Sequence, residues 1–148
     1  MGGRPGREAG PQPRGHVRRR AGRRQAIDVV FQADLTGAEP TRVLEEWRSA
    51  GRKIYPYAED VVRGVAGRIQ AIDQVLGDHL EGWTVPRMAG VDRAILRVAY
   101  YELEAGVPAA IAISEAVEAA AELSTEDSGR FVNGILGRIA REIAPDEG

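Results

Sequence analysis

The chain has 148 residues, of which 43% are hydrophobic and none is cysteine. This length suits a single hydrophobic core, and the lack of cysteine excludes disulfides, a thiol nucleophile and thiolate metal sites. The formal net charge of −2 combines +7 in residues 1–24 with −9 in the rest, and such a basic arm on an acidic body indicates either a polyanion-binding arm or a solvated tail.

The N-terminal segment is predicted to be a tail followed by a helix. Residues 1–16 contain five glycines, three prolines and almost no apolar side chains, so they cannot recover the entropy cost of ordering and are expected to be disordered. Apolar side chains then recur at helical spacing: Ile27, Val30, Phe31 and Leu35. We therefore expect a first helix over residues 17–36 and a single helical domain over residues 17–148.

The middle of the chain predicts short amphipathic helices. Pro40 suits a helix start and Gly51 a helix end, with a short apolar stripe between them. Apolar residues then follow steps of three and four across residues 57–81, interrupted by three glycines. Because glycine weakens a helix interior by about 1 kcal/mol, we expect one bent helix or two joined helices there.

Three more helices are expected in the C-terminal half. Pro86 opens the most apolar segment, which closes at Gly106 and should be the central helix. An alanine-rich segment at about residues 110–123 allows close packing, and Ser124 or Thr125 offers an N-cap for a last helix. No stretch alternates with period two, so the sequence predicts an all-α fold, a compact bundle of six or seven helices.

Catalytic and metal-binding motifs are missing from the sequence. It has no phosphate-binding glycine loop, nucleophile elbow or zinc-protease motif, so we expect no enzymatic activity, no metal and no cofactor. Glu115, Glu118 and Glu122 fall along one helix face, which is typical of a solvated surface. Without an apolar run of roughly 20 residues or a signal peptide, the protein is expected in the cytoplasm, away from membranes.

Arginines gather at the start of the first helix. Arg20 and Arg24 share the angular face of Phe31, so this face should dock into the bundle at its C-terminal half and present guanidinium groups to phosphates or bases at its N-terminal turns. Gly22 lies inside the cluster and is expected to interrupt the helix. The alternative is an overhanging helix end whose arginines only keep the protein soluble.

Residues 124–134 hold a second group of candidate nucleic-acid contacts. The apolar stripe of the last helix centres near Ile135 and Ile139, which leaves Phe131 at its edge beside Arg130. A ring at such an edge can stack on an unpaired base, although it can also close the end of the core. Asp127 has a simple interpretation as a first-turn carboxylate that favours the helix N-terminus.

Three motifs, in order along the chain, resemble the NusB family. Residues 91–103 (VDRAILRVAYYEL) resemble the signature V-[DE]-[RK]-A-[IV]-L-R-x-A-x-[YW]-E-L, and residues 107–118 (VPAAIAISEAVE) resemble V-P-x-x-V-A-I-N-E-A-V-E. Residues 127–136 are similar to the closing D-S-x-x-F-V-N-G-[IV]-L. With the arginine cluster and the first helix, the resemblance covers about residues 17–143 and is weak over residues 36–86.

The resemblance implies two packed helical subdomains and an RNA-binding transcription antitermination factor that recognises boxA in nascent ribosomal RNA leaders. It also implies a protein partner, the small-subunit ribosomal protein NusE, and loading of a transcription elongation complex that resists termination. The RNA-binding residues would by position be Arg18, Arg19, Arg20, Arg23, Arg24, Asp127, Arg130 and Phe131. Phe31 and Asp92 fall at positions associated with the NusE surface, and Phe31 lacks the hydroxyl of the tyrosine often found there.

Two other functions are compatible with the sequence. A NusB-like domain also serves as the RNA-recognition module of ribosomal RNA cytosine methyltransferases, which would require a longer reading frame than one ending at Gly148. A homodimeric bundle that only binds proteins predicts weak, salt-dependent RNA binding without sequence preference. The apolar stripes alone do not distinguish a monomer from a homodimer.

Overall fold

The computed structural model describes the backbone of residues 13–143 and the side chains of residues 18–143. Within these residues the chain forms seven α-helices and one 3-10 turn, which confirms the predicted all-α fold. The helices are α1 (Pro13–Thr36), α2 (Pro40–Ser49), α3 (Pro56–Ala66), α4 (Ile69–Asp78), α5 (Gly90–Glu104), α6 (Ala109–Leu123) and α7 (Glu126–Ile143). The 3-10 turn, η2, spans Val85–Arg87.

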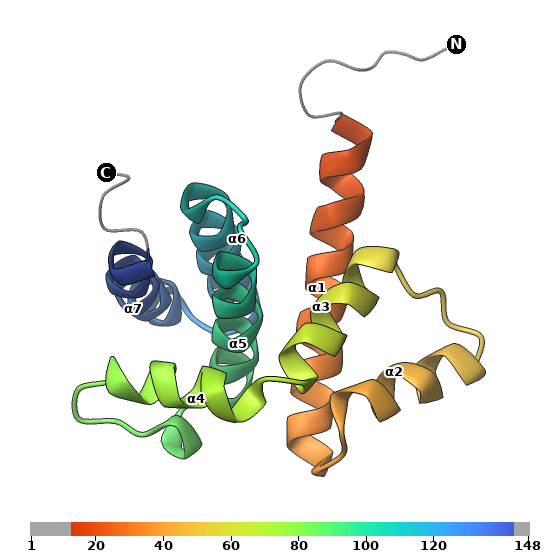
Figure 1. Ribbon diagram of the computed structural model, residues 1–148, viewed down its shortest axis with the longest axis horizontal. Helices are drawn as coiled ribbons and strands as arrows, with labels where there is room; N and C mark the ends of the chain where they lie inside the picture. Colours follow the sequence, from red (N-terminus) through yellow and green to blue (C-terminus); the bar gives the residue numbers. More distant parts are fainter. Residues whose placement is uncertain (1–12, 144–148) are drawn as a thin grey trace.

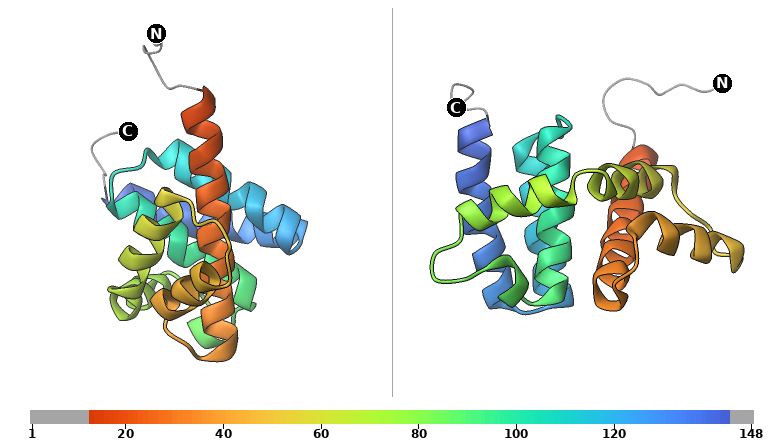
Figure 2. Two further views of the ribbon diagram at one scale, coloured as in Figure 1. Left: turned by 90° about the vertical axis from the view of Figure 1, so that its right-hand side faces the viewer. Right: turned by 60° about the horizontal axis from the view of Figure 1, so that its bottom comes forward.

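The helices form two groups that meet where α1 packs against α5 (Figure 1). One group holds α1, α2 and α3, and the other holds α4 to α7, with α6 packed against both α5 and α7. Figure 2 shows that the N-terminal turns of α1 project beyond the remaining helices. Only the start of α1 projects in this way, since Gly22 and Arg23 are already packed against other helices.

The most apolar helix, α5, is central, as predicted. Its aliphatic side chains are buried on several sides because α1 and α3 cover it from one group and α6 and α7 from the other. Ile95 and Leu96 are completely buried, and each such side chain stabilises the fold by roughly 1.5–3 kcal/mol relative to an exposed position. The core thus joins the two groups into one body.

Prolines, glycines and one threonine set the helix ends. Pro40 and Pro56 stand at the first helical positions, where the N–H that proline lacks would be unpaired in any case. Gly37 adopts a φ of 78° directly after α1, a conformation that other residues rarely take. The Thr125 hydroxyl accepts a hydrogen bond from the Ser128 backbone N–H at 3.0 Å and caps α7, as predicted.

The structure corrects two predictions about α1. The helix begins at Pro13, which fits a first turn, so residues 13–16 are helical rather than part of a disordered tail. Residues 1–12 of that tail lie outside the described residues. The helix also runs unbroken through Gly22, where an added Cβ would lie 3.0 Å from the Tyr57 Cβ. Glycine is needed there because α3 approaches closely.

Two further boundaries are settled by the structure. Residues 57–81 hold two helices rather than one bent helix, and α3 and α4 separate at Gly67 and Arg68. Pro86 lies in η2 and does not start the central helix, which begins at Gly90. The loop that carries η2 is therefore a separate element that runs from α4 to α5.

None of the helices in the described part of the chain combines the length and apolar character that a membrane span requires. In the same part of the chain, no cluster of three His, Asp or Glu side chains could hold a metal ion. The His79 ring is used within the fold instead, since Nδ1 lies 2.8 Å from the Val75 carbonyl and Nε2 lies 3.0 Å from Glu142.

Candidate nucleic-acid interface

The arginines of α1 occupy three environments. Arg18 and Arg19 are exposed, Arg20 and Arg24 face α6, and Arg23 points into the core. This division follows from helix geometry, because successive residues are turned by about 100° around the axis. The sequence cluster is therefore not one continuous cationic surface.

Arg20 and Arg24 bridge to the row of glutamates on α6. Arg24 Nη1 donates to Glu122 Oε1 at 3.0 Å, and Arg20 Nη2 forms an ion pair with Glu118. Arg20 Nε also lies 3.2 Å from Glu115 Oε1, without the alignment of a hydrogen bond. The hydrogen bond from Arg24 lowers the pKa of Glu122, so this carboxylate stays ionised at neutral pH. Glu118 and Glu122 are exposed, as expected of a solvated face, and the row also pairs with α1.

Arg23 forms a buried ion pair with α5. Its Nε lies 2.9 and 2.7 Å from the two carboxylate oxygens of Glu102, which is completely buried. The Tyr57 hydroxyl donates to the same carboxylate, and burial together with this hydrogen bond raises the pKa of Tyr57 far above its usual range. Because Arg23 is only 3% exposed, the structure removes it from the predicted RNA surface. It joins α1 to α5.

The second group of predicted residues lies on the first turns of α7. Asp127 and Arg130 are exposed and pair with each other, and Phe131 is half-buried at the edge of the core, as its sequence position predicted. Glu122, the partner of Arg24, precedes Asp127 by five residues, so their Cα atoms lie within about 18 Å. Arg24 therefore lies near the α6–α7 turn, whereas Arg20 pairs with Glu118 one helical turn earlier on α6.

A mostly apolar cavity of about 490 Å³ opens beside Phe131. It is lined by Trp83, Arg87, Met88, Ala89, Asp92, Thr125, Asp127, Ser128 and Phe131. Trp83 is 54% exposed, and the Arg87 guanidinium lies 5.7 Å from the centre of its ring. Neither residue was predicted as part of the site, although an aromatic side chain in a polar loop was a usable signal. Aromatic walls suit a flat, unstacked nucleobase.

Two residues, Phe31 and Asp92, were predicted to contact a protein partner. Asp92 lines this cavity, and Phe31 lies beside Gly90 at the start of α5. The Phe31 ring packs against α5, since an added Cβ on Gly90 would lie 3.2 Å from Phe31 Cε1. Asp92 is only 7% exposed, and its Oδ2 accepts a hydrogen bond from the Ser128 hydroxyl at 2.9 Å. Asp92 thus joins α5 to α7 and is not presented as an exposed charge.

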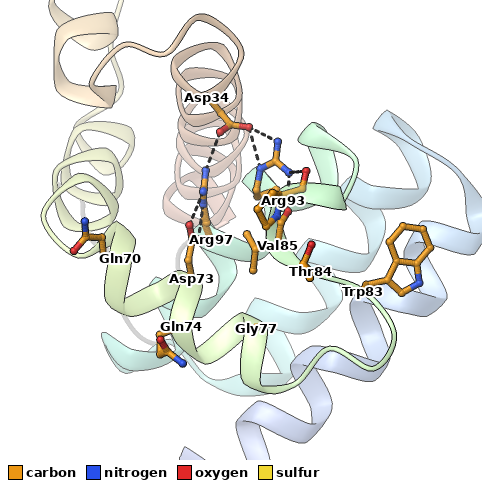
Figure 3. Close-up of a pocket in the computed structure, with 11 residues that line it drawn as sticks. Asp34, Gln70, Asp73, Gln74, Gly77, Trp83, Thr84, Val85, Arg93 and Arg97 are labelled. Carbon is orange, nitrogen blue, oxygen red and sulfur yellow. Dashed lines mark hydrogen bonds and ion pairs between the residues drawn. The ribbon is translucent and has the colours of Figure 1, made fainter.

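A second cavity, of about 640 Å³, lies beside α4, η2 and α5 (Figure 3). Its charged residues pair with one another: Arg97 donates to both oxygens of Asp73 at 2.8 and 2.7 Å, and Arg93 donates to Asp34 at 3.0 and 2.6 Å. Arg93 also donates to backbone carbonyls in and next to η2. This network fixes the loop between α4 and α5 against α1, so we assign it a structural role.

Sequence comparison relates the chain to a known protein family. Residues 20–141 match the sequence profile of the NusB family. The chain is 47% identical over 128 residues to the transcription antitermination protein NusB of Salinispora tropica, with 82% of this chain and 94% of that protein covered. The corresponding protein of Saccharopolyspora erythraea is also 47% identical over 128 residues, with 82% and 86% covered.

Solved structures have the same arrangement of helices. NusB of T. maritima is similar to the chain with a TM-score of 0.76 and 38% identity, over 87% of this chain and 94% of that one. A crystal structure of antitermination factors NusB and NusE in complex with dsRNA gives a TM-score of 0.76 and 26% identity, over 85% and 98%. The likeness covers most of the chain in both sequence and fold.

Proposed function

Because the chain belongs to the NusB family of transcription antitermination proteins, we propose that it captures boxA in nascent ribosomal RNA together with NusE. The similar structure that contains NusB, NusE and RNA supports both partners. The relatives are antitermination proteins matched over 94% and 86% of their length, which favours this role over that of a methyltransferase module. The protein acts by binding rather than by catalysis, in the cytoplasm where the RNA is made.

One observation carries the proposal for RNA: the arginines of α1 run along α6 toward the α6–α7 turn, and a half-buried aromatic ring lies beyond that turn on α7. Arg18 and Arg19 are exposed, and the side chains of Arg20 and Arg24 are 39% and 26% exposed. Guanidinium groups bind phosphate oxygens in pairs, and this sequence-independent attraction supplies most of the affinity.

The α7 group supplies the contact with a base. Phe131 borders an apolar cavity whose lining also includes Trp83, so an unpaired base can leave the RNA stack and lie against the ring. Such stacking contributes roughly 1–3 kcal/mol per base. Asp127 and Arg130 are exposed beside it and offer an acceptor and donors for base edges or phosphates.

NusE is proposed to dock near Phe31 and the start of α5. Phe31 has no hydroxyl, so its contact with NusE is apolar packing. Asp92 is engaged by Ser128 and contributes by fixing α7 against α5 rather than as a free charge. The pair bound to boxA then joins the transcription elongation complex and makes transcription processive.

Substitutions at Phe131 test the base contact. Phe131→Ala is expected to weaken boxA binding by roughly 1–3 kcal/mol at fixed salt, because the stacking surface is lost. Phe131→Leu should weaken it similarly, since leucine keeps the apolar packing but has no ring face, whereas Phe131→Trp should retain most of the affinity. Affinities are measured by fluorescence anisotropy, and thermal unfolding confirms that each variant is folded.

If Phe131→Leu binds boxA as tightly as the unchanged protein, the ring has no role in stacking. The proposal for this residue then fails, and Phe131 is a core side chain that closes the end of α7.

A further inference from the structure

Two rows of opposite charge face each other across α1 and α6 with the same spacing. Arg20 and Arg24 are one helical turn apart on α1, and Glu118 and Glu122 are one turn apart on α6. Arg24 pairs with Glu122, and Arg20 pairs with Glu118 while its Nε also lies 3.2 Å from the buried Glu115. The guanidinium groups proposed to bind phosphate are therefore already occupied by carboxylates of the same chain.

These outer pairs contribute little to holding the helices together. The side chains of Glu118 and Glu122 are 46% and 52% exposed, and exposed ion pairs are weak because water and salt screen them. The firm link of α1 to the rest of the bundle lies deeper, where Arg23 meets the completely buried Glu102. The fold does not depend on the outer row.

The same pairs obstruct the proposed function. The guanidinium groups that a phosphate would bind are already paired with the carboxylates of Glu118 and Glu122. These carboxylates also repel a phosphate, because both are negatively charged. A groove of about 390 Å³ between the two rows, lined by Arg20, Ala21, Arg24 and Glu122, lets RNA approach the pairs from solvent. Binding then exchanges one anion for another.

Resting on the proposed RNA-binding function, we infer that Glu118 and Glu122 are built-in competitors of RNA phosphates for Arg20 and Arg24. They weaken the sequence-independent part of RNA binding. An RNA without further contacts at α7 is held poorly, whereas one that also stacks a base there has a second source of affinity. The two glutamates thereby keep binding to arbitrary RNA low.

The experiment replaces Glu118 and Glu122 by glutamine, which removes the negative charge and keeps the size of the side chain. Glu118→Gln/Glu122→Gln is compared with Glu45→Gln/Glu46→Gln, a control that removes the same charge from α2, where the glutamates also pair with exposed arginines. Fluorescence anisotropy gives the affinity of each protein for a labelled boxA RNA and for a scrambled RNA of equal length. Thermal unfolding checks that all proteins are folded.

We expect the α6 variant to bind both RNAs about 2- to 20-fold more tightly than the α2 control, since two exposed pairs no longer have to be broken. In an Arg20→Gln/Arg24→Gln background the same glutamate substitutions should give no gain beyond the control. Such a cycle separates competition at these arginines from a general effect of charge.

Weaker binding by the α6 variant would overturn the inference and identify the pairs as a clamp that prepares α1 for RNA. Equal binding by the α6 variant and the control, or a gain that persists without the two arginines, would overturn it as well. Each of these results is distinct from a failure of the proposed function, which would appear in the unchanged protein as a lack of preference for boxA.

Discussion

Arg23 differs from its neighbours on α1 because it faces the core. The apolar stripe of this helix was predicted through Phe31, which placed Arg24 on the core side. In the structure Val30 is 1% exposed and Phe31 is only half-buried, so the buried face of α1 is centred closer to Val30 than to Phe31. Arg23 lies on this buried face. Its partner Glu102 lies 79 residues further along the chain, and no local pattern indicates so distant a pairing.

The buried pair makes a prediction about stability. Glu102→Gln is expected to lower the free energy of unfolding by about 3–5 kcal/mol, because the buried Arg23 guanidinium would lose its nearest counter-charge and keep only Glu115, 3.6 Å from its Nη1. Urea denaturation followed by circular dichroism measures the loss. Glu45→Gln, which removes a partner of the exposed Arg48, should cost less than about 1 kcal/mol. Similar small losses in both variants would argue against a structural role for Arg23.

Features of the candidate site could be predicted where the signal was local. The place of Phe131 at the edge of the core was predicted from the apolar stripe, which is a property of one helix. Trp83 and Arg87 were missed because they reach the same cavity from a loop, and the course of that loop is fixed by the contacts of Arg93 with Asp34 and the backbone. Tertiary contacts of this kind leave no periodic trace in the sequence.

Whole helices were predicted more reliably than their contacts. Prolines at helix starts and a glycine with positive φ after α1 act on the backbone of a few neighbouring residues, so the sequence alone indicates them. Glycines inside helices were harder to interpret. Gly22 was expected to interrupt α1, whereas it permits α3 to approach, and only the packed structure distinguishes these two roles.

The same contrast predicts opposite effects of alanine at two helical glycines. An added Cβ at Gly64 would lie 2.2 Å from the Tyr101 ring, whereas at Gly134 it would meet nothing within 4 Å. Gly64→Ala should lower the free energy of unfolding by about 1–3 kcal/mol through overpacking between α3 and α5. Gly134→Ala should raise it by about 0.5–1 kcal/mol, because alanine favours the helix and nothing opposes it.

Chemical denaturation of the two variants beside the unchanged protein checks this pair of predictions. A Gly64→Ala variant as stable as Gly134→Ala would mean that Tyr101 moves away freely, and the close packing of α3 on α5 would then carry little energy.

The molecule as a whole divides its charge between an overhanging basic end and an acidic body. Composition alone revealed the division, +7 in residues 1–24 against −9 elsewhere, but it overstated the cationic surface. Of the five arginines in residues 18–24, one is buried and two pair with α6. The number of arginines free to meet phosphate depends on how the two groups of helices pack, which the sequence does not reveal.

The fold connects this charge distribution to antitermination. The two helix groups are joined through α1 and α5, so the arginines of one group and the α7 residues of the other are held at fixed positions relative to each other. We propose that a short RNA segment contacts both at once and that NusE adds its surface at Phe31. We therefore expect the binding of RNA and the binding of the protein partner to support each other.

Joint capture of boxA by this protein and NusE is tested most directly by fluorescence anisotropy. A labelled boxA RNA and a scrambled RNA of equal length are titrated with the unchanged protein, with and without NusE, at fixed salt. We predict tighter binding to boxA than to the scrambled RNA, and a further gain for boxA when NusE is present. Equal, weak binding of both RNAs that NusE does not change would contradict joint capture and leave a helical scaffold with a basic end.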